Sequence, residues 1–173
     1  MKYPLIFTLL LCAVLSEAQN AKPYFQQEVN YRIDVSLDDK THILTGVVEM
    51  EYLNNAPDAL PVIWIHLWGN AYKNRETAFC KQKLRDGNRN FYFADDKNLG
   101  YFKNLDFTVD GRKASWKYDR DNPDIVLLTL EQPLQPGGRI KIATPFSLKI
   151  PASYSRLGHA GAAYQMTQWY LIK

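Results

Sequence analysis

Hydrophobic and polar residues alternate along much of this chain, and the alternation predicts short β-strands. Between residues 29 and 37, apolar side chains occupy the odd positions, with polar residues such as Asn30 and Arg32 between them. A period of two is typical of a strand that has one face buried and the other in water. After a polar turn, a second alternating strand is predicted over Ile43–Leu53. Residues 61–68 are almost continuously apolar, which predicts a strand covered on both faces.

Turn signals divide the following sequence into further short strands. Asp110-Gly111 follows an apolar segment at residues 101–109 and predicts a hairpin. Gln135-Pro-Gly-Gly138 predicts another turn, between strands over residues 125–130 and 139–143. These signals recur at the close spacing that is typical of all-β domains.

A last strand is predicted over residues 146–150, and residues 75–84 alone suggest a short helix, which Asp86-Gly87-Asn88 would end. The pattern therefore predicts an all-β domain of about eight or more strands with at most one short helix. Both a sandwich and an open barrel fit this pattern.

The first 18 residues have the pattern of a signal peptide. Met1-Lys2 is a short positive region, residues 4–15 are apolar, and Ser16 and Ala18 are the small residues that precede a cleavage site. The apolar run is shorter than the roughly 20 residues that span a bilayer, and no second run of that length follows. We therefore expect export to the periplasm or the extracellular space, with residues 19–173 as one domain and no transmembrane span. Leu9-Leu-Leu-Cys12 leaves open a lipidated Cys12 and membrane association.

Charge and cysteine content exclude two classes of protein. The net charge is only +3, and the lysines and arginines are scattered between carboxylates, which argues against a nucleic-acid partner. Cleavage after residue 18 would leave Cys80 as the only thiol, so the domain is not a disulfide scaffold.

The three histidines do not form a catalytic metal site. None has a second histidine or a carboxylate at the His-Glu-x-x-His spacing. We expect His42, beside a turn, to be solvated and His66, between Trp64 and Trp68, to be packed and hydrogen-bonded. His159 lies in a glycine-containing segment that predicts a flexible loop able to face a ligand. From the residues alone, no catalytic site, bound metal or cofactor is expected in this chain.

Aromatic residues leave a different function open. Four tryptophans and eleven tyrosines could form a stacking platform for sugars, as in carbohydrate-binding modules. Packing is the competing interpretation, and we favour it because Trp64 and Trp68 belong to the most apolar predicted strand.

Several motifs, taken in order, resemble the aminopeptidase N family of zinc metallopeptidases. Tyr31-Arg-Ile-Asp-Val-Ser-Leu37 and Ile43-Leu-Thr-Gly-Val-Val-Glu-Met-Glu-Tyr52 are similar to its two opening strands. Leu67-Trp-Gly-Asn-Ala-Tyr72 resembles a segment of its exported bacterial branch. The sequence from Phe146 to Tyr170 resembles the close of the N-terminal domain in that branch. The similarity covers nearly all of residues 19–173.

This resemblance implies a saddle-shaped β-sandwich that packs against a separate gluzincin catalytic domain. In such enzymes the catalytic domain holds zinc, and the last strand of the N-terminal domain brings a Thr-Gln-x-Glu or Thr-Gln-x-Gln motif to the bound peptide's amino end. Thr167 and Gln168 match this motif, whereas Tyr170 stands where its acidic or amide residue would be. The zinc ligands and the catalytic glutamate of the family do not occur in this sequence, so we expect the chain to be inactive alone.

Three hypotheses follow from the sequence. The first is the N-terminal domain of an exported zinc aminopeptidase, truncated before its catalytic domain, which would supply part of the wall that binds peptide N-termini. The second is a free-standing exported β-sandwich that binds a glycan or a protein. The third is an accessory subunit of a separately encoded catalytic chain. A chain cut before its catalytic domain would expose an apolar patch around Tyr164 and Trp169.

Overall fold

The computed structural model describes residues 24–173, so the predicted signal peptide and Cys12 lie outside the described residues. The described chain is predominantly β-sheet with one α-helix, as the sequence predicts. Its strands are β1 Glu28–Asp38, β2 Ile43–Leu53, β3 Leu60–His66, β4 Tyr101–Lys103, β5 Thr108–Val109, β6 Arg112–Lys113, β7 Ser115–Tyr118, β8 Ile125–Leu134, β9 Arg139–Lys149, β10 Leu157–Ala160 and β11 Ala163–Met166. The helical elements are the 3₁₀ helices η2 Trp68–Tyr72 and η3 Asp96–Asn98 and the α-helix α2 Ala78–Arg85. None of these helices is long and apolar enough to cross a membrane.

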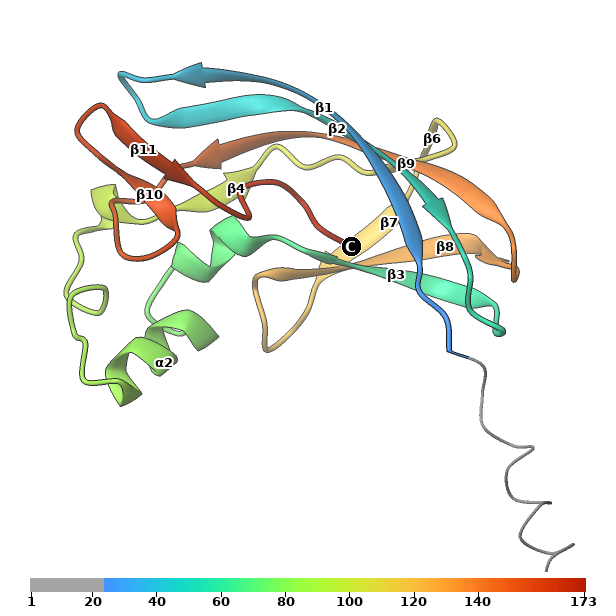
Figure 1. Ribbon diagram of the computed structural model, residues 1–173, viewed down its shortest axis with the longest axis horizontal. Helices are drawn as coiled ribbons and strands as arrows, with labels where there is room; N and C mark the ends of the chain where they lie inside the picture. The colour runs from blue at the N-terminus through green and yellow to red at the C-terminus, as the bar shows by residue number, and fades with distance from the viewer. Residues whose placement is uncertain (1–23) are drawn as a thin grey trace, which may run out of the picture.

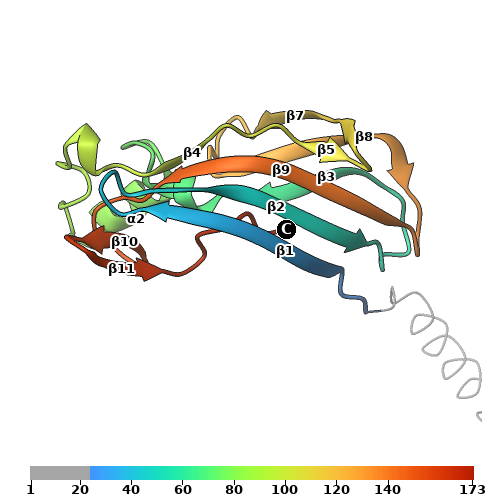
Figure 2. The same ribbon diagram turned by 90° about the horizontal axis from the view of Figure 1, so that it is seen from above.

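Two antiparallel sheets face each other and form a sandwich-like fold (Figures 1 and 2). The larger sheet has the order β1-β2-β9-β5-β6, and β4 also pairs with β9. The smaller sheet has the order β3-β8-β7, and β10 and β11 form a separate hairpin at one end. Strand β1 is therefore an edge strand of the larger sheet, and β3 is an edge strand of the smaller sheet.

The long strands of the larger sheet follow the alternation of the sequence closely. Strand β2 pairs with β1 from Ile43 opposite Asp38 to Leu53 opposite Glu28, without a break in register. Its inward residues Val48, Met50 and Tyr52 are almost fully buried. A shift of the strand pairing by one residue would point these side chains toward solvent, so the alternation fixes the register of the sheet.

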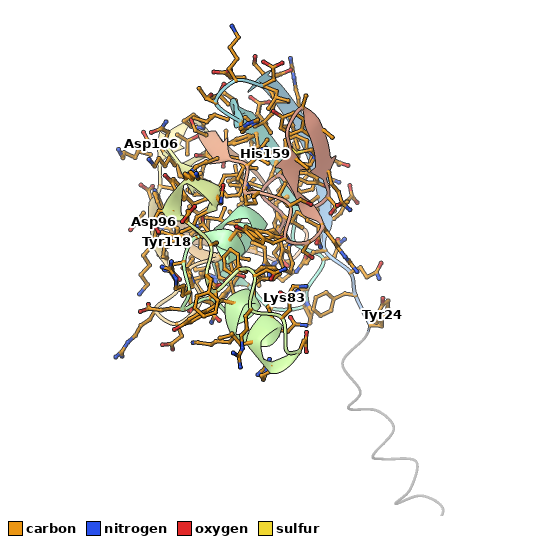
Figure 3. All side chains as sticks on the ribbon, turned by 90° about the vertical axis from the view of Figure 1, so that its left-hand side faces the viewer. Tyr24, Lys83, Asp96, Asp106, Tyr118 and His159 are labelled. Atoms are coloured by element: carbon orange, nitrogen blue, oxygen red, sulfur yellow. The ribbon has the colours of Figure 1, made fainter. Side chains whose placement is uncertain are left out.

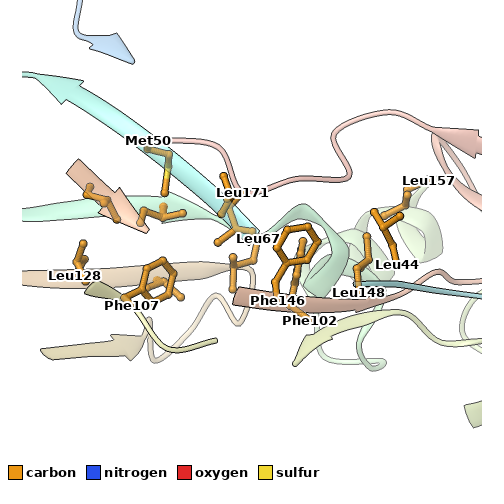
Figure 4. Packing of buried hydrophobic residues seen from close by; sticks show 14 of the residues in the cluster. Leu44, Met50, Leu67, Phe102, Phe107, Leu128, Phe146, Leu148, Leu157 and Leu171 are labelled. Carbon is orange, nitrogen blue, oxygen red and sulfur yellow. The ribbon is translucent and has the colours of Figure 1, made fainter. Parts of the chain in front are cut away.

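The core lies between the two sheets and reaches into the helical end of the molecule. Figure 4 shows part of it, with Met50 and Phe146 from the larger sheet and Leu128 from the smaller one. Leu67 and Leu171, which follow β3 and β11 in sequence, belong to the same cluster and are fully buried. Leu171 therefore ties the last residues of the chain to the core.

The prediction of one strand over residues 101–109 is wrong, because this segment forms two short strands, β4 and β5. Both pair with β9, and Asn104 between them has a left-handed backbone with φ 58°. Opposite the interruption lies Pro145, which has no N–H to donate to a ladder. Side chains replace the missing ladder there: the Asp106 N–H donates to Thr144 Oγ1 at 2.9 Å.

Strand β9 is longer than predicted. Residues 139–143 and 146–150 are not two strands, since one strand runs from Arg139 to Lys149 through Pro145. The turn at residues 135–138 and the hairpin at Asp110-Gly111 are confirmed, and Asp110 and Gly111 both have positive φ.

Strand β3 is not covered on both faces as predicted. Ile63 and Ile65 point into the core, but the side chain of Trp64 between them is 50% exposed. The continuous apolar sequence therefore marks a strand whose outer face keeps an exposed aromatic ring.

The helix α2 begins later than predicted, at Ala78. The Oγ1 atom of Thr77 accepts a hydrogen bond from the Cys80 N–H at 3.3 Å and so caps the first turn. Phe79 on this helix packs against the rings of Tyr72 and Phe91, with centroids 4.6 and 5.2 Å away. This aromatic cluster attaches α2 to the end of the sandwich.

After β11 the chain returns to the side of the sandwich between edge strands β1 and β3. Ile172 and His66 exchange two backbone hydrogen bonds, of 2.6 and 3.0 Å, and the Lys173 N–H donates to the Tyr31 hydroxyl at 3.0 Å. Residues 171–173, which we call the C-terminal segment, thus fill part of the space between the two edges (Figure 1).

The apolar patch expected around Tyr164 and Trp169 is only partly exposed. Both rings are only partly accessible and pack against the core. In the described residues, the most exposed large apolar side chains are instead Tyr24 and Phe93.

Candidate functional site

A cleft of about 480 Å³ lies at the end of the molecule where α2 and the hairpin β10–β11 meet. Figure 3 looks onto this end, with Lys83 on α2 and His159 on β10. The lining residues come from η2, α2, the turn before β8, the start of β10 and the segment after β11: Trp68, Ala71, Tyr72, Ala78, Phe79, Gln82, Lys83, Asp124, Ser155, Arg156, Leu157, Thr167 and Gln168. Segments far apart in sequence therefore meet here.

Two of the three predicted site residues, Thr167 and Gln168, line this cleft. Both the N–H and the Oγ1 of Thr167 donate to the Arg156 carbonyl, at 3.2 and 2.6 Å, which fixes the segment after β11 to the start of β10. The Gln168 side chain is exposed, and its backbone is left-handed, with φ 54°. A residue with a Cβ rarely adopts this conformation, so the surrounding structure holds Gln168 in a strained position beside the cleft.

Tyr170, the third predicted residue, lies outside the cleft. Its ring contacts Tyr31 edge-on, with centroids 5.5 Å apart, and Trp169 in the same way at 5.4 Å. Tyr170 therefore packs against β1, on the side occupied by the C-terminal segment.

The cleft combines charged groups of both signs with an aromatic wall. Lys83 and Arg156 bring positive charge, Asp124 brings a carboxylate, and Gln82 and Gln168 bring amides. The Asp124 carbonyl also accepts from the Leu67 N–H at 2.7 Å, which fixes the position of its backbone. Such a lining suits a small zwitterionic or polar ligand that also carries an apolar group.

Tyr72 forms the buried part of this wall. Burial raises the pKa of its phenol, although hydrogen bonds with the Leu157 backbone and the Ser155 side chain act in the opposite direction. The hydroxyl is thus already hydrogen-bonded within the protein, and these bonds hold the start of β10 against η2.

Two histidines that the sequence placed in separate surroundings lie against each other. The rings of His42 and His159 are stacked, with centroids 3.5 Å apart, and His42 Nδ1 lies 2.7 Å from the Tyr164 hydroxyl. The predictions of a solvated His42 and of His159 in a flexible loop are therefore wrong, because β10 and β11 form a hairpin that packs on the β1–β2 turn. Burial, together with the neighbouring His42, lowers the pKa of His159.

His66 is packed as predicted, but its hydrogen bonding differs. Its ring stacks on Trp68 with centroids 4.9 Å apart and planes 10° from parallel. Its buried Nδ1 atom has no hydrogen-bond partner among the described residues. Cys80 is fully buried, and burial raises the pKa of its thiol, so it is not poised as a nucleophile.

Residues 24–173 contain no group of three or more His, Cys, Asp or Glu side chains that could hold a metal ion. The cleft holds no nucleophile paired with a base either. The geometry therefore suits binding, and the polar groups on its rim would orient a ligand.

No protein-family model matches this chain, and no curated protein is significantly similar to it.

Proposed function

We propose that this chain is the non-catalytic N-terminal domain of an exported aminopeptidase N-type zinc metallopeptidase, in which it supplies part of the wall that binds peptide N-termini. Zinc and the catalytic glutamate would belong to a gluzincin domain that packs against the cleft, either as further sequence or as a separate chain. In this proposal the domain has no hydrolytic activity alone.

The observation that carries this proposal is the position of Thr167 and Gln168 on one cleft with Asp124. A peptide amino terminus is a cation that donates hydrogen bonds, and a carboxylate and an amide oxygen are suitable acceptors for it. Arg156 and Lys83 on the same cleft would face the carbonyls or the carboxylate of a short peptide. The aromatic wall would contact its first side chain.

Binding of a short peptide to the isolated domain tests this proposal. In an NMR titration, Leu-Gly-Gly with a free amino group should shift the amide signals of Thr167 and Gln168, whereas its N-acetylated form should not. Gln168→Ala should abolish the shifts, and Gln165→Ala, an exposed amide on β11, should leave them unchanged. Equal shifts with the acetylated peptide, or no shift at the cleft, would overturn the proposal.

A second assay tests the absence of catalysis. The purified domain with added zinc should not hydrolyse aminoacyl-anilides. Turnover that a chelator removes would show that this domain carries a catalytic site of its own.

Trp64 supports a different function, the free-standing binding module. Its half-exposed indole ring on the outer face of β3 could stack on a sugar. Quenching or a shift of tryptophan fluorescence by soluble oligosaccharides, lost in Trp64→Ala and kept in Trp169→Phe, would favour this module over the peptidase domain.

A further inference from the structure

The hairpin β10–β11 connects the histidine pair to the cleft. It lies beside the turn between β1 and β2 (Figures 1 and 2). His159 and Tyr164 are cross-strand partners near its tip, so their side chains share one face, and both contact His42 of that turn. At its base the hairpin continues into Arg156 and Thr167, which line the cleft. A titratable contact at one end of the hairpin is therefore connected to the cleft wall at the other.

Side chains at the tip hold the hairpin on the turn. The rings of His42 and His159 are stacked, with planes 18° from parallel. The Tyr164 hydroxyl lies 2.7 Å from His42 Nδ1 and 3.3 Å from the carbonyl oxygen of Asp39. The main chain of residues 151–153 also bonds to β10, but these residues carry no charge and do not respond to pH. A lone two-stranded hairpin is marginally stable in water, so its position depends on such contacts.

Charged side chains close to the pair lie on the β1–β2 turn. Beside His42 in sequence are the carboxylates of Asp38 and Asp39 and the ammonium group of Lys40. A hydrogen bond from the Thr41 hydroxyl lowers the pKa of Asp38, so this carboxylate stays ionised in mild acid and attracts a protonated His42. The hairpin itself adds no carboxylate, lysine or arginine between residues 157 and 166.

A proton on His159 is unfavourable while the hairpin lies on the turn. Burial lowers the pKa of His159, and the neighbouring His42 lowers it further, against a hydrogen bond with the Gly161 backbone. Tyr164 does not offset the charge, because burial raises the pKa of its phenol and keeps it neutral. A released hairpin would return His159 to its ordinary pKa near 6.5. The released form therefore binds more protons, and acid favours it.

Strand β11 is the part of the hairpin that can move. Leu157 at the start of β10 is almost fully buried in the core, whereas alternate residues of β11 are exposed. The segment after β11 is held to β10 by two hydrogen bonds from Thr167 to the Arg156 carbonyl. Gln168 follows with a strained left-handed backbone, and movement of β11 would relieve this strain.

We propose that His42 and His159 form a pH-sensitive switch that keeps β11 on the β1–β2 turn at neutral pH and releases it in mild acid. Release withdraws Thr167 and Gln168 from the cleft wall. For one proton on an ordinary histidine, the ratio of released to docked hairpin rises by up to about tenfold between about pH 7.5 and pH 5.5. The release does not depend on what the cleft binds, whereas its effect on peptide binding rests on the function proposed for the cleft.

Hydrogen exchange of the whole domain, corrected for the intrinsic dependence on pH, tests the release. The Thr167 amide proton should lose protection by about three- to tenfold between about pH 7.5 and pH 5.5. Its exchange should be insensitive to low urea concentrations, since local opening exposes little surface, whereas exchange at the buried Val48 on β2 should accelerate with urea. Equal protection and equal urea dependence at both positions would mean global unfolding and would overturn the proposal.

Three substitutions test the assignment to this pair. His159→Phe keeps a ring that can stack on His42 but takes up no proton, so the protection of Thr167 should no longer depend on pH. The control His66→Phe removes a histidine on β3 and should keep the full response. Tyr164→Phe should speed exchange at both pH values and keep the response, because both histidines remain. A response that persists in His159→Phe, or that is lost in His66→Phe, would refute the assignment.

The wild-type protein offers a test that needs no substitution. In an NMR titration of the imidazole signals, His42 and His159 should titrate as a coupled pair in two separated steps. The Thr167 amide signal should shift with the second step. Independent titration of the two rings, or a Thr167 signal that does not follow them, would contradict the switch.

Peptide binding tests the effect on the cleft. The affinity for Leu-Gly-Gly should fall by about three- to tenfold from about pH 7.5 to pH 5.5 in the wild type and should not fall in His159→Phe. Acid protonates more of the peptide's amino group, which acts in the opposite direction, so this group does not cause the fall. Equal binding at both pH values would refute the switch. Binding at neither would refute the function proposed for the cleft, and hydrogen exchange would still decide whether β11 is released.

Discussion

Replacing Tyr52 by phenylalanine should stabilise the isolated domain. The ring is almost completely buried in the core, so its apolar contacts would remain, and only the hydroxyl would be lost. That hydroxyl makes no hydrogen bond within the described chain. A buried polar group without a partner destabilises a protein by about 1–3 kcal/mol.

We therefore expect the free energy of unfolding of Tyr52→Phe to rise by about 1–2 kcal/mol. For a domain of this size, a gain of that order raises Tm by roughly 2–8 °C. Urea denaturation followed by far-UV circular dichroism measures the change, and an unaltered m-value would show that the folded state keeps its compactness.

Tyr72→Phe is the matched control. Tyr72 is also buried, but its hydroxyl has hydrogen-bond partners at Leu157 and Ser155. Its removal should destabilise the domain by about 1–2 kcal/mol, because a bond is lost and a partner is left unpaired. If Tyr52→Phe destabilised the domain as much as Tyr72→Phe, the Tyr52 hydroxyl would be satisfied and the reasoning would be refuted.

Three further changes probe other parts of the molecule. Leu171→Ala should lower the free energy of unfolding by about 2–5 kcal/mol, because it empties a fully buried position, whereas the exposed Leu84→Ala should cost little. Folding lowers the pKa of His159, so as the pH falls the unfolded state takes up a proton at this residue before the folded state does. The free energy of unfolding should therefore decrease as the pH drops below about 6.5, and it should decrease less in His159→Gln. Gln168→Gly should raise stability by about 0.5–1 kcal/mol by relieving the left-handed backbone.

A specific result would contradict each of these three predictions. Equal effects of Leu171→Ala and Leu84→Ala in thermal unfolding would mean that the C-terminal segment is not anchored in the core. An identical pH dependence of stability in His159→Gln would place the responsible group elsewhere. A destabilised Gln168→Gly variant would mean that the Gln168 side chain makes contacts that outweigh its backbone strain.

The sequence was sufficient to predict the elements whose hydrophobic pattern is local. Strand β2 has the predicted bounds, because its alternate residues Val48, Met50 and Tyr52 are buried in the core. Strand β1 has nearly the predicted bounds, although Val35 and Leu37 at its end are exposed. The hairpin at Asp110-Gly111 was predictable because Asp and Gly both accept positive φ. An interruption such as that at Asn104 left no comparable signal, since its cause, Pro145, lies on another strand.

The site was predictable only in part. Thr167 and Gln168 were found through a family motif, but their neighbours Asp124 and Lys83 reach the cleft from distant segments. The stacking of His42 on His159 depends on the hairpin β10–β11, whose sequence around Gly158 and Gly161 has no apolar alternation.

The pairing of β2 with β9 has a consequence for how the protein is made. These strands lie side by side in an unbroken register, yet Ile43 and its partner Lys149 are about a hundred residues apart in the chain, and such distant pairing slows folding. When β1 and β2 emerge from the ribosome, their hairpin has nothing to cover it, and a lone two-stranded hairpin is at best marginally stable in water. The unpaired strand β2 of the nascent chain must therefore be kept from aggregating until β9 has been synthesised. The interval between the synthesis of β2 and that of β9 is thus the period in which the risk of aggregation is greatest.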